Sequence, residues 1–120
     1  MSNIIYHTSV KNIGPSVEAF GGEMMILFGE GAPDTLKDYC YTIDVNAADQ
    51  TIVPGQTLAI GGEDFNILYV GEIAQRNLES LGHLTVNFTG KEENLLPGAI
   101  VVEARPKPLM EIGTTIAVIG

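Results

Sequence analysis

Three side chains in this sequence can act as nucleophiles: the histidines His7 and His83 and the single cysteine, Cys40. A ring nitrogen of histidine or a cysteine thiolate can form a covalent intermediate when a neighbour fixes its orientation and hydrogen-bond donors surround the group that it accepts. These three residues therefore define the places where nucleophilic catalysis is most readily expected.

His83 is the preferred candidate acceptor because it follows Gly82, at the junction between a predicted helix and a predicted strand, where a side chain can reach solvent. An alternative is that His83 is a strand-edge residue bonded to a backbone carbonyl. The partial negative charge at a helix C-terminus favours the imidazolium form and disfavours a phosphate. His7 ranks below His83 because it lies within a predicted strand.

Cys40 is interpreted as a small buried apolar residue, the more common role of a lone cysteine. Only Lys37 is close to it in sequence as a basic group that would lower its pKa. Lys37 and Arg76 are the cations nearest to the candidate sites, where each would either bind a phosphoryl oxygen or remain solvated.

The motifs of metal and cofactor sites are missing from the sequence. Two distant histidines and one cysteine do not supply the three or four ligands of a transition-metal centre. The glycines form neither a GxGxxG fingerprint nor a phosphate-binding P-loop, and no GxSxG elbow occurs. We therefore predict no metal and no cofactor.

The elements that must position these side chains are mostly strands. Alternation of apolar and polar residues predicts strands, and glycine or proline marks the turns between them. One helix of about one and a half turns follows Asp34 as its N-cap, and a second contains Ile73, Leu78 and Leu81 on one face and ends at Gly82. Strands are predicted at residues 3–13, 24–28, 40–45, 65–70 and 84–88 and in the β-rich parts of the runs 53–60, 96–102 and 112–118, and helices at residues 35–39 and 72–81.

Because strands outnumber helices and do not alternate with long ones, we predict a mainly β fold, a single small antiparallel β-barrel or roll over residues 1–120 with one or two short helices. A weak internal similarity joins residues 53–60, 96–102 and 112–118, each of which has a glycine-containing turn followed by a β-rich run. Shared turn chemistry explains this similarity better than a true repeat.

Composition limits the classes of partner. The 120 residues contain six Lys and Arg against fifteen Asp and Glu, a net charge of −9, which disfavours nucleic acid and anionic membranes. An acidic surface attracts a basic protein, or simply keeps a small domain soluble. No apolar run is long enough to span a membrane and no secretory signal is evident, so we expect a cytoplasmic protein.

Several short segments together resemble one protein family. They are Ile13-Gly14, the run Glu30–Pro33 (EGAP) with Leu36, the run Asp38–Cys40 (DYC), residues 77–88 (NLESLGHLTVNF) and Pro97-Gly98. In this order and spacing they resemble the glucitol/sorbitol-specific enzyme IIA component of the bacterial phosphoenolpyruvate-dependent sugar phosphotransferase system (PTS). The resemblance spans nearly the whole chain.

The resemblance implies a phosphocarrier that takes a phosphoryl group from phospho-HPr and passes it to a membrane-bound IIB/IIC component. In that family the acceptor histidine follows the DYC segment, and the matching position here is Ile43. His83 matches a histidine in the family's LGH segment, so it is the expected catalytic residue. The alternative is a non-catalytic paralogue with a binding or regulatory role. An exposed edge at residues 24–28 would support a homodimer.

Overall fold

The computed structural model describes residues 3–120, and its eight strands form a closed barrel. This confirms the prediction of a mainly β fold with short helices. The helical segments are α1 (Asp34–Lys37), α2 (Ala74–Leu81) and two single 3₁₀ turns, η1 (Val17–Phe20) and η2 (Glu92–Asn94). The strands are β1 (Ile4–Ile13), β2 (Met24–Phe28), β3 (Cys40–Ile43), β4 (Thr57–Ile60), β5 (Glu63–Val70), β6 (Leu84–Asn87), β7 (Ala99–Val102) and β8 (Thr115–Ile119).

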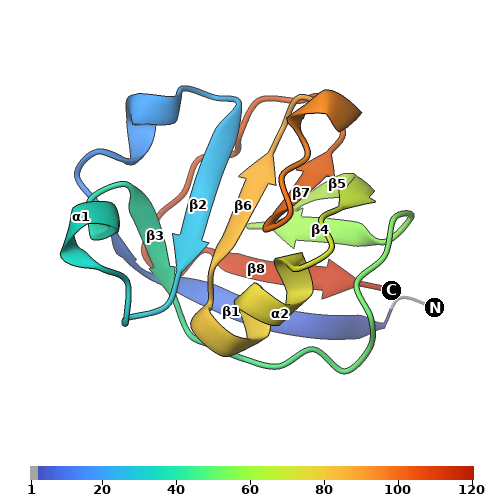
Figure 1. Ribbon diagram of the computed structural model, residues 1–120, viewed down its shortest axis with the longest axis horizontal. Coiled ribbons are helices and arrows are strands. Elements are labelled where there is room, and N and C mark those ends of the chain that lie inside the picture. Colours follow the sequence, from blue (N-terminus) through green and yellow to red (C-terminus); the bar gives the residue numbers. More distant parts are fainter. Residues whose placement is uncertain (1–2) are drawn as a thin grey trace.

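The order of strands around the barrel is β1-β3-β2-β6-β7-β5-β4-β8, with β8 returning to β1. Two neighbouring pairs, β2–β3 and β6–β7, are parallel, and the other six are antiparallel. Figure 1 shows β3, β2, β6 and β7 side by side, with α1 beside β3 and α2 in front of the lower end of β6. The predominance of antiparallel pairing agrees with the prediction, whereas the two parallel pairs were not foreseen.

The barrel has an approximate two-fold symmetry that relates β1–β4 to β5–β8. The pairs β1–β3 and β5–β7 correspond, as do β8–β1 and β4–β5, while β2–β6 and β4–β8 lie on the symmetry axis. Even the register is shared, because Ile26 lies opposite Cys40 in β2–β3 and Thr85 lies opposite Ala99 in β6–β7. The two halves of the chain therefore have the same strand topology, although their connections differ.

The symmetry extends to the irregular positions. The β1–β3 register shifts between Val10 and Asn12, and the β5–β7 register shifts at the corresponding place, between Ile67 and Tyr69. Such bulges bend a strand and increase its twist, which is how a small sheet closes on itself. Both halves of the barrel therefore have a bulge at the corresponding position.

The internal similarity of the sequence is partly explained by this symmetry. β4 and β8 are equivalent strands that pair with each other, and each follows a glycine with a positive φ, Gly55 at 96° and Gly113 at 94°. The remaining similar run, residues 96–102, leads into β7, whose counterpart is β3. Equivalence in the fold thus underlies two of the three similar runs, and turn chemistry accounts for the third.

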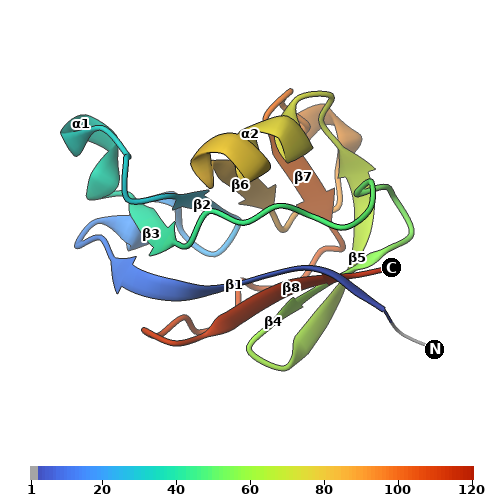
Figure 2. The same cartoon turned by 90° about the horizontal axis from the view of Figure 1, so that it is seen from below.

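Alternate residues of the strands fill the interior, and Ala74 and Leu78 of α2 join them in one buried cluster. Figure 2, seen from below, places α2 on the opposite side of the molecule from β4 and β8. α2 therefore covers the interior beside β6. A second, smaller cluster of Phe28, Ala32 and Cys40 lies apart from this core.

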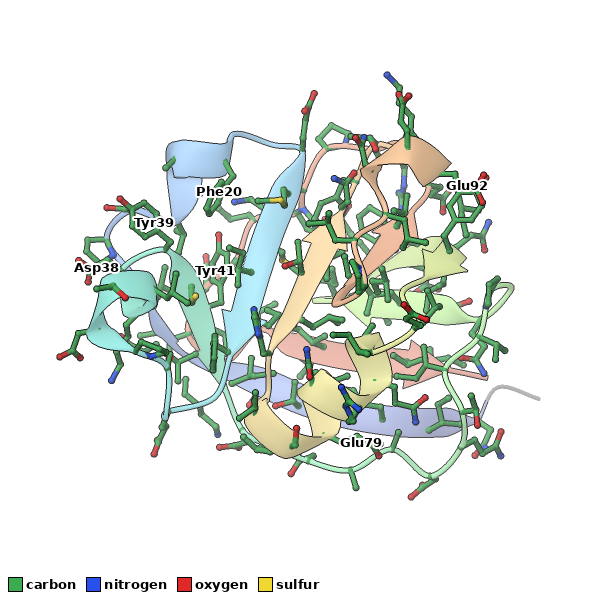
Figure 3. All side chains as sticks on the ribbon, viewed as in Figure 1. Phe20, Asp38, Tyr39, Tyr41, Glu79 and Glu92 are labelled. Atoms are coloured by element: carbon green, nitrogen blue, oxygen red, sulfur yellow. The ribbon has the colours of Figure 1, made fainter. Side chains whose placement is uncertain are left out.

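Beside α1, side-chain contacts join the connection between β7 and β8 to β3. The Nζ of Lys107 donates a hydrogen bond of 3.0 Å to the hydroxyl of Tyr41 and lies 3.4 Å from a carboxylate oxygen of Glu18, and its side chain is only 5% exposed. Figure 3 shows Tyr41 close to the ring pair formed by Phe20 and Tyr39. These contacts hold Tyr41 of β3 against Lys107 in the connection between β7 and β8.

Three local expectations are corrected. α1 has Pro33 at its N-cap and no side-chain capping bond, so Asp34 does not act as the predicted cap. The third strand ends at Ile43, two residues before its predicted end. β2 is flanked by β3 and β6, so residues 24–28 offer no free strand edge for the predicted homodimer.

No helix in residues 3–120 has the length and apolar character needed to cross a membrane.

Candidate functional site

The turn between α2 and β6 fixes the backbone of His83. Gly82 adopts a left-handed conformation with a φ of 70°, as predicted for the residue that ends the helix. Its amide donates to the carbonyl of Leu78, and the amide of His83 donates to the carbonyl of Asn77. The bond from Gly82 is that of the αL cap, in which the residue after a helix bonds the carbonyl four residues before it. The carbonyl of Leu81, also in the last turn, accepts from the amide of Gly29.

The imidazole ring of His83 stacks on Phe28 of β2. The two ring centroids are 4.3 Å apart and the planes differ by 16°. His83 is half-buried, while Phe28 is buried. Stacking on a buried ring restricts the orientation of the imidazole plane.

Partial burial lowers the pKa of His83 below its ordinary value of 6.5. The imidazole is therefore neutral at pH 7, which is the form that carries a nucleophilic lone pair. Because the folded state binds this proton less tightly than the unfolded chain, the group reduces stability as the pH falls below about 6.5.

We expect Phe28→Ala to raise the pKa of His83 towards 6.5, because water would replace the ring that now covers the imidazole. A proton NMR titration of the two histidine rings measures this shift, with His7 as the internal reference. Phe20→Ala, which removes the ring that packs on Tyr39, is the matched control and should leave the His83 titration unchanged. An unaltered pKa of His83 in Phe28→Ala would contradict burial as the cause.

Ile43 lies inside the barrel. It is 0% exposed, belongs to the main core cluster and faces Val10 across the β1–β3 pair. An alkyl side chain at this position can only pack, so Ile43 takes part in no chemistry.

The segment after Ile43 nevertheless reaches the turn that carries His83. A methyl group built on Gly29 would lie 2.6 Å from the Cγ2 of Val45, and one built on Gly82 would lie 3.3 Å from the same atom. The amide of Gly29 donates to the carbonyl of Leu81. Three connections thus meet here, those that follow β2, β3 and α2, and glycine is required where they touch.

Two apolar side chains are exposed at this meeting point. Val45 is 46% exposed and Leu81 is 49% exposed. Leu81 was predicted to share a helix face with Leu78, but Leu78 is buried whereas Leu81 is exposed. Together with His83, Phe28 and Gly29 they form what we call the His83 surface.

Cys40 has the structural role predicted for it. It is buried beneath α1, and its Sγ donates a hydrogen bond of 3.1 Å to the carbonyl of Leu36. Burial raises the pKa of the Cys40 thiol, so the thiol stays protonated at neutral pH.

His7 lies elsewhere on the barrel. It is exposed on β1, opposite Ala117 of β8, and β3 and β2 separate its strand from β6. Its carbonyl accepts a hydrogen bond from the side chain of Asn46. The open groove beside it has a volume of about 410 Å³ and is lined by Ile4, Ile5, Tyr6, His7, Asn46, Ala47 and Asp49. The structure does not bring His7 and His83 together.

The cations considered from the sequence are not part of an ion pair. Among residues 3–120 the two ion pairs are Lys11 with Asp44 and Lys107 with Glu18, so neither Lys37 nor Arg76 has an acidic partner. No group of three His, Cys, Asp or Glu side chains in the same range could hold a metal ion.

Comparisons with known proteins point to one family. Residues 5–117 match the family model of the PTS system glucitol/sorbitol-specific IIA component. The glucitol/sorbitol-specific EIIA components of Escherichia coli (strain K12) and of Shigella flexneri are each 36% identical over 106 residues, which is 88% of this chain and 85% of theirs.

A solved structure agrees with this assignment. The crystal structure of a PTS system IIA component from Enterococcus faecalis V583 superposes with a TM-score of 0.82 at 31% identity, covering 92% of this chain and 97% of that one. The chain belongs to the glucitol/sorbitol-specific IIA family of the phosphotransferase system.

Proposed function

We propose that this protein is a phosphocarrier that receives a phosphoryl group from phospho-HPr and passes it to a IIB component, and that His83 is the acceptor. One observation carries the assignment of the residue: His83 is a neutral, oriented imidazole beside an exposed surface, in a chain of the IIA family. Ile43 has no nucleophilic atom and is enclosed by the core.

The transfer exchanges one phosphorus–nitrogen bond for another. The unprotonated ring nitrogen of His83 attacks the phosphorus, the bond from phosphorus to the donor imidazole breaks, and its electron pair returns to the donor nitrogen. The second transfer, to the IIB component, repeats these steps with His83 as the leaving group. No oxidant, reductant or metal is required, because each transfer replaces one nucleophilic atom by another at phosphorus.

The charge of the protein favours this role. A net charge of −9 gives the chain an acidic surface, and opposite charge on a partner raises the rate of encounter. HPr presents a basic face in this system, so an acidic carrier suits it.

A second function is favoured by Ile43. If the acceptor of this family stands only at that position, a buried alkyl group there makes the chain a binding or regulatory relative that carries no phosphate. The two functions differ in a single measurable property, the ability to become phosphorylated.

The test is to incubate the protein with phosphoenolpyruvate, enzyme I and HPr, and to measure the intact mass. We expect one added phosphoryl group, which is lost in mild acid as expected for phosphohistidine. The E. coli relative, labelled in parallel, shows that the donor system is active. If the relative is labelled and this protein is not, the phosphocarrier function is wrong and the binding function replaces it.

A further inference from the structure

Phe28 and His83 are direct neighbours across the β2–β6 pair. The antiparallel register places Leu27 opposite Leu84, so the next residues on the two sides, Phe28 and His83, also lie opposite each other. Leu27 and Leu84 belong to the barrel core. Since successive side chains of a strand point to opposite faces, Phe28 and His83 lie on the outer face of the barrel. The contact between their rings is therefore separate from the packing inside the barrel.

A small apolar cluster outside the barrel core holds the Phe28 ring. This cluster, which we call the Phe28 cluster, contains Phe28, Ala32 and Cys40, with Ile26 packed against them. Phe28 is only 7% exposed although it lies outside the barrel. The connection through α1 covers it, since Ala32 precedes this helix and the thiol of Cys40 donates to the carbonyl of Leu36 within it. The imidazole of His83 therefore stacks on a ring that is itself held in place.

The approximate two-fold symmetry of the barrel does not extend to these two side chains. Under the equivalence of β2 with β6, Phe28 corresponds to Asn87 and His83 corresponds to Met24. Met24 and Asn87 lie opposite each other at the other end of the same strand pair. That pair has neither an imidazole nor an aromatic ring, and the Asn87 side chain bonds to Thr89 instead. The backbone of the barrel thus closes without a ring stack, which indicates another role for the stack on His83.

We propose that Phe28 is a positioning residue for phosphoryl transfer, which holds the plane of the His83 imidazole in the orientation from which a ring nitrogen attacks phosphorus. This inference rests on the proposed function, because it assigns a support to the acceptor. The torsion that turns a histidine ring has broad minima, so an unstacked imidazole would adopt many orientations. A nucleophile must instead lie in line with the bond that breaks. The inference also gives a role to Cys40, which packs behind the Phe28 ring and takes no part in the chemistry.

Phe28→Leu tests the inference, because leucine keeps the apolar bulk and removes the flat ring. Phe20→Leu is the matched control: Phe20 packs on Tyr39, with ring centroids 5.9 Å apart, and loses the same atoms. We expect the maximal rate of phosphorylation by phospho-HPr to fall about tenfold in Phe28→Leu, with the KM for phospho-HPr unchanged, and both to be unchanged in Phe20→Leu. A raised KM with an unchanged maximal rate would overturn the inference, because Phe28 would then act in donor binding.

A small donor separates the orientation of the imidazole from its reactivity. Phosphoramidate can approach the ring from any direction, so Phe28→Leu should accept from it at the rate of the unmodified protein. Both donors are compared at about pH 8, where the imidazole is neutral. An equal loss with phosphoramidate would contradict the positioning role, because it would show a less reactive nitrogen. If neither donor labels the unmodified protein, the proposed function is wrong and the positioning role is rejected with it.

A measurement on the unmodified protein guards against a variant that folds poorly. An aromatic ring moves the proton resonances of a group stacked on it upfield, so the ring protons of His83 should resonate upfield of those of His7, which is exposed on β1. The difference should vanish in Phe28→Leu and persist in Phe20→Leu. Its absence from the unmodified protein would overturn the inference without any variant. So would a Phe28→Leu protein that loses the upfield shift and still accepts from phospho-HPr at the unmodified rate.

Discussion

His83→Ala should reduce phosphorylation by phospho-HPr by more than about a thousandfold, because it removes the nucleophile of the transfer and no second imidazole lies on the same surface. The rate of phosphoryl incorporation by rapid-quench labelling measures this effect. The stability of the variant should be nearly unchanged or slightly higher below pH 6.5, because the proton that the folded state binds weakly is no longer involved.

His7→Ala is the control for this experiment. It removes the other histidine, which is exposed on β1 opposite Ala117, and should leave the labelling rate unchanged. A labelled His83→Ala protein that loses its label when His7 is also replaced would move the acceptor to the groove beside β1. That result would reject the assignment of His83 while retaining the phosphocarrier function.

Gly14→Ala and Gly71→Ala should each destabilise the protein by about 3 kcal/mol or more, which lowers the melting temperature by roughly 10 °C or more. A methyl group on Gly14 would lie 2.3 Å from the carbonyl oxygen of Asp38, and one on Gly71 would lie 2.2 Å from that of Pro97. Both obstacles are backbone atoms, which cannot move aside as a flexible side chain can.

These two glycines are equivalent under the approximate two-fold symmetry. The amide of Gly14 donates to the carbonyl of Cys40 in β3, and that of Gly71 donates to the carbonyl of Ala99 in β7. Each glycine therefore bonds to a strand of the parallel pair in its own half of the barrel. Gly22→Ala is the control, because no atom lies within 4 Å of its added methyl group. Thermal unfolding followed by circular dichroism compares the three. If Gly14→Ala and Gly71→Ala unfold at the same temperature as Gly22→Ala, the close approach of backbone carbonyls to Gly14 and Gly71 does not limit stability.

Local sequence signals predicted most elements because their causes are local. Gly82 ended α2 because a left-handed residue is needed there, and the apolar run of residues 24–28 became a central strand, paired with β3 and β6 on its two edges. The choice of strand partners could not be predicted in this way. Whether β2 pairs in parallel with β3 depends on the route that the connection through α1 takes between them. The types of the individual residues in that connection do not reveal its route.

The candidate site was predicted only in part for the same reason. His83 could be found from its residue type and from the glycine before it. Its neighbours Phe28, Val45 and Leu81 could not be grouped with it, because they come from separate parts of the chain. Alternation predicted one strand over residues 40–45, but β3 ends at Ile43, and Val45 is exposed beside Gly29 and Gly82. A period-two pattern of apolar residues does not show where hydrogen bonding to the neighbouring strand ends.

The symmetry of the barrel also determines how the chain can fold. β4 pairs with β5 and β8 and with no strand of its own half, and β8 likewise pairs with β4 and with β1. Each half therefore completes the sheet of the other, and neither has a closed sheet until both have been synthesised. Folding must be cooperative across the whole barrel and comparatively slow, because the decisive pairings join residues far apart in sequence. A chain containing only one half could close the same ring only as a symmetric dimer.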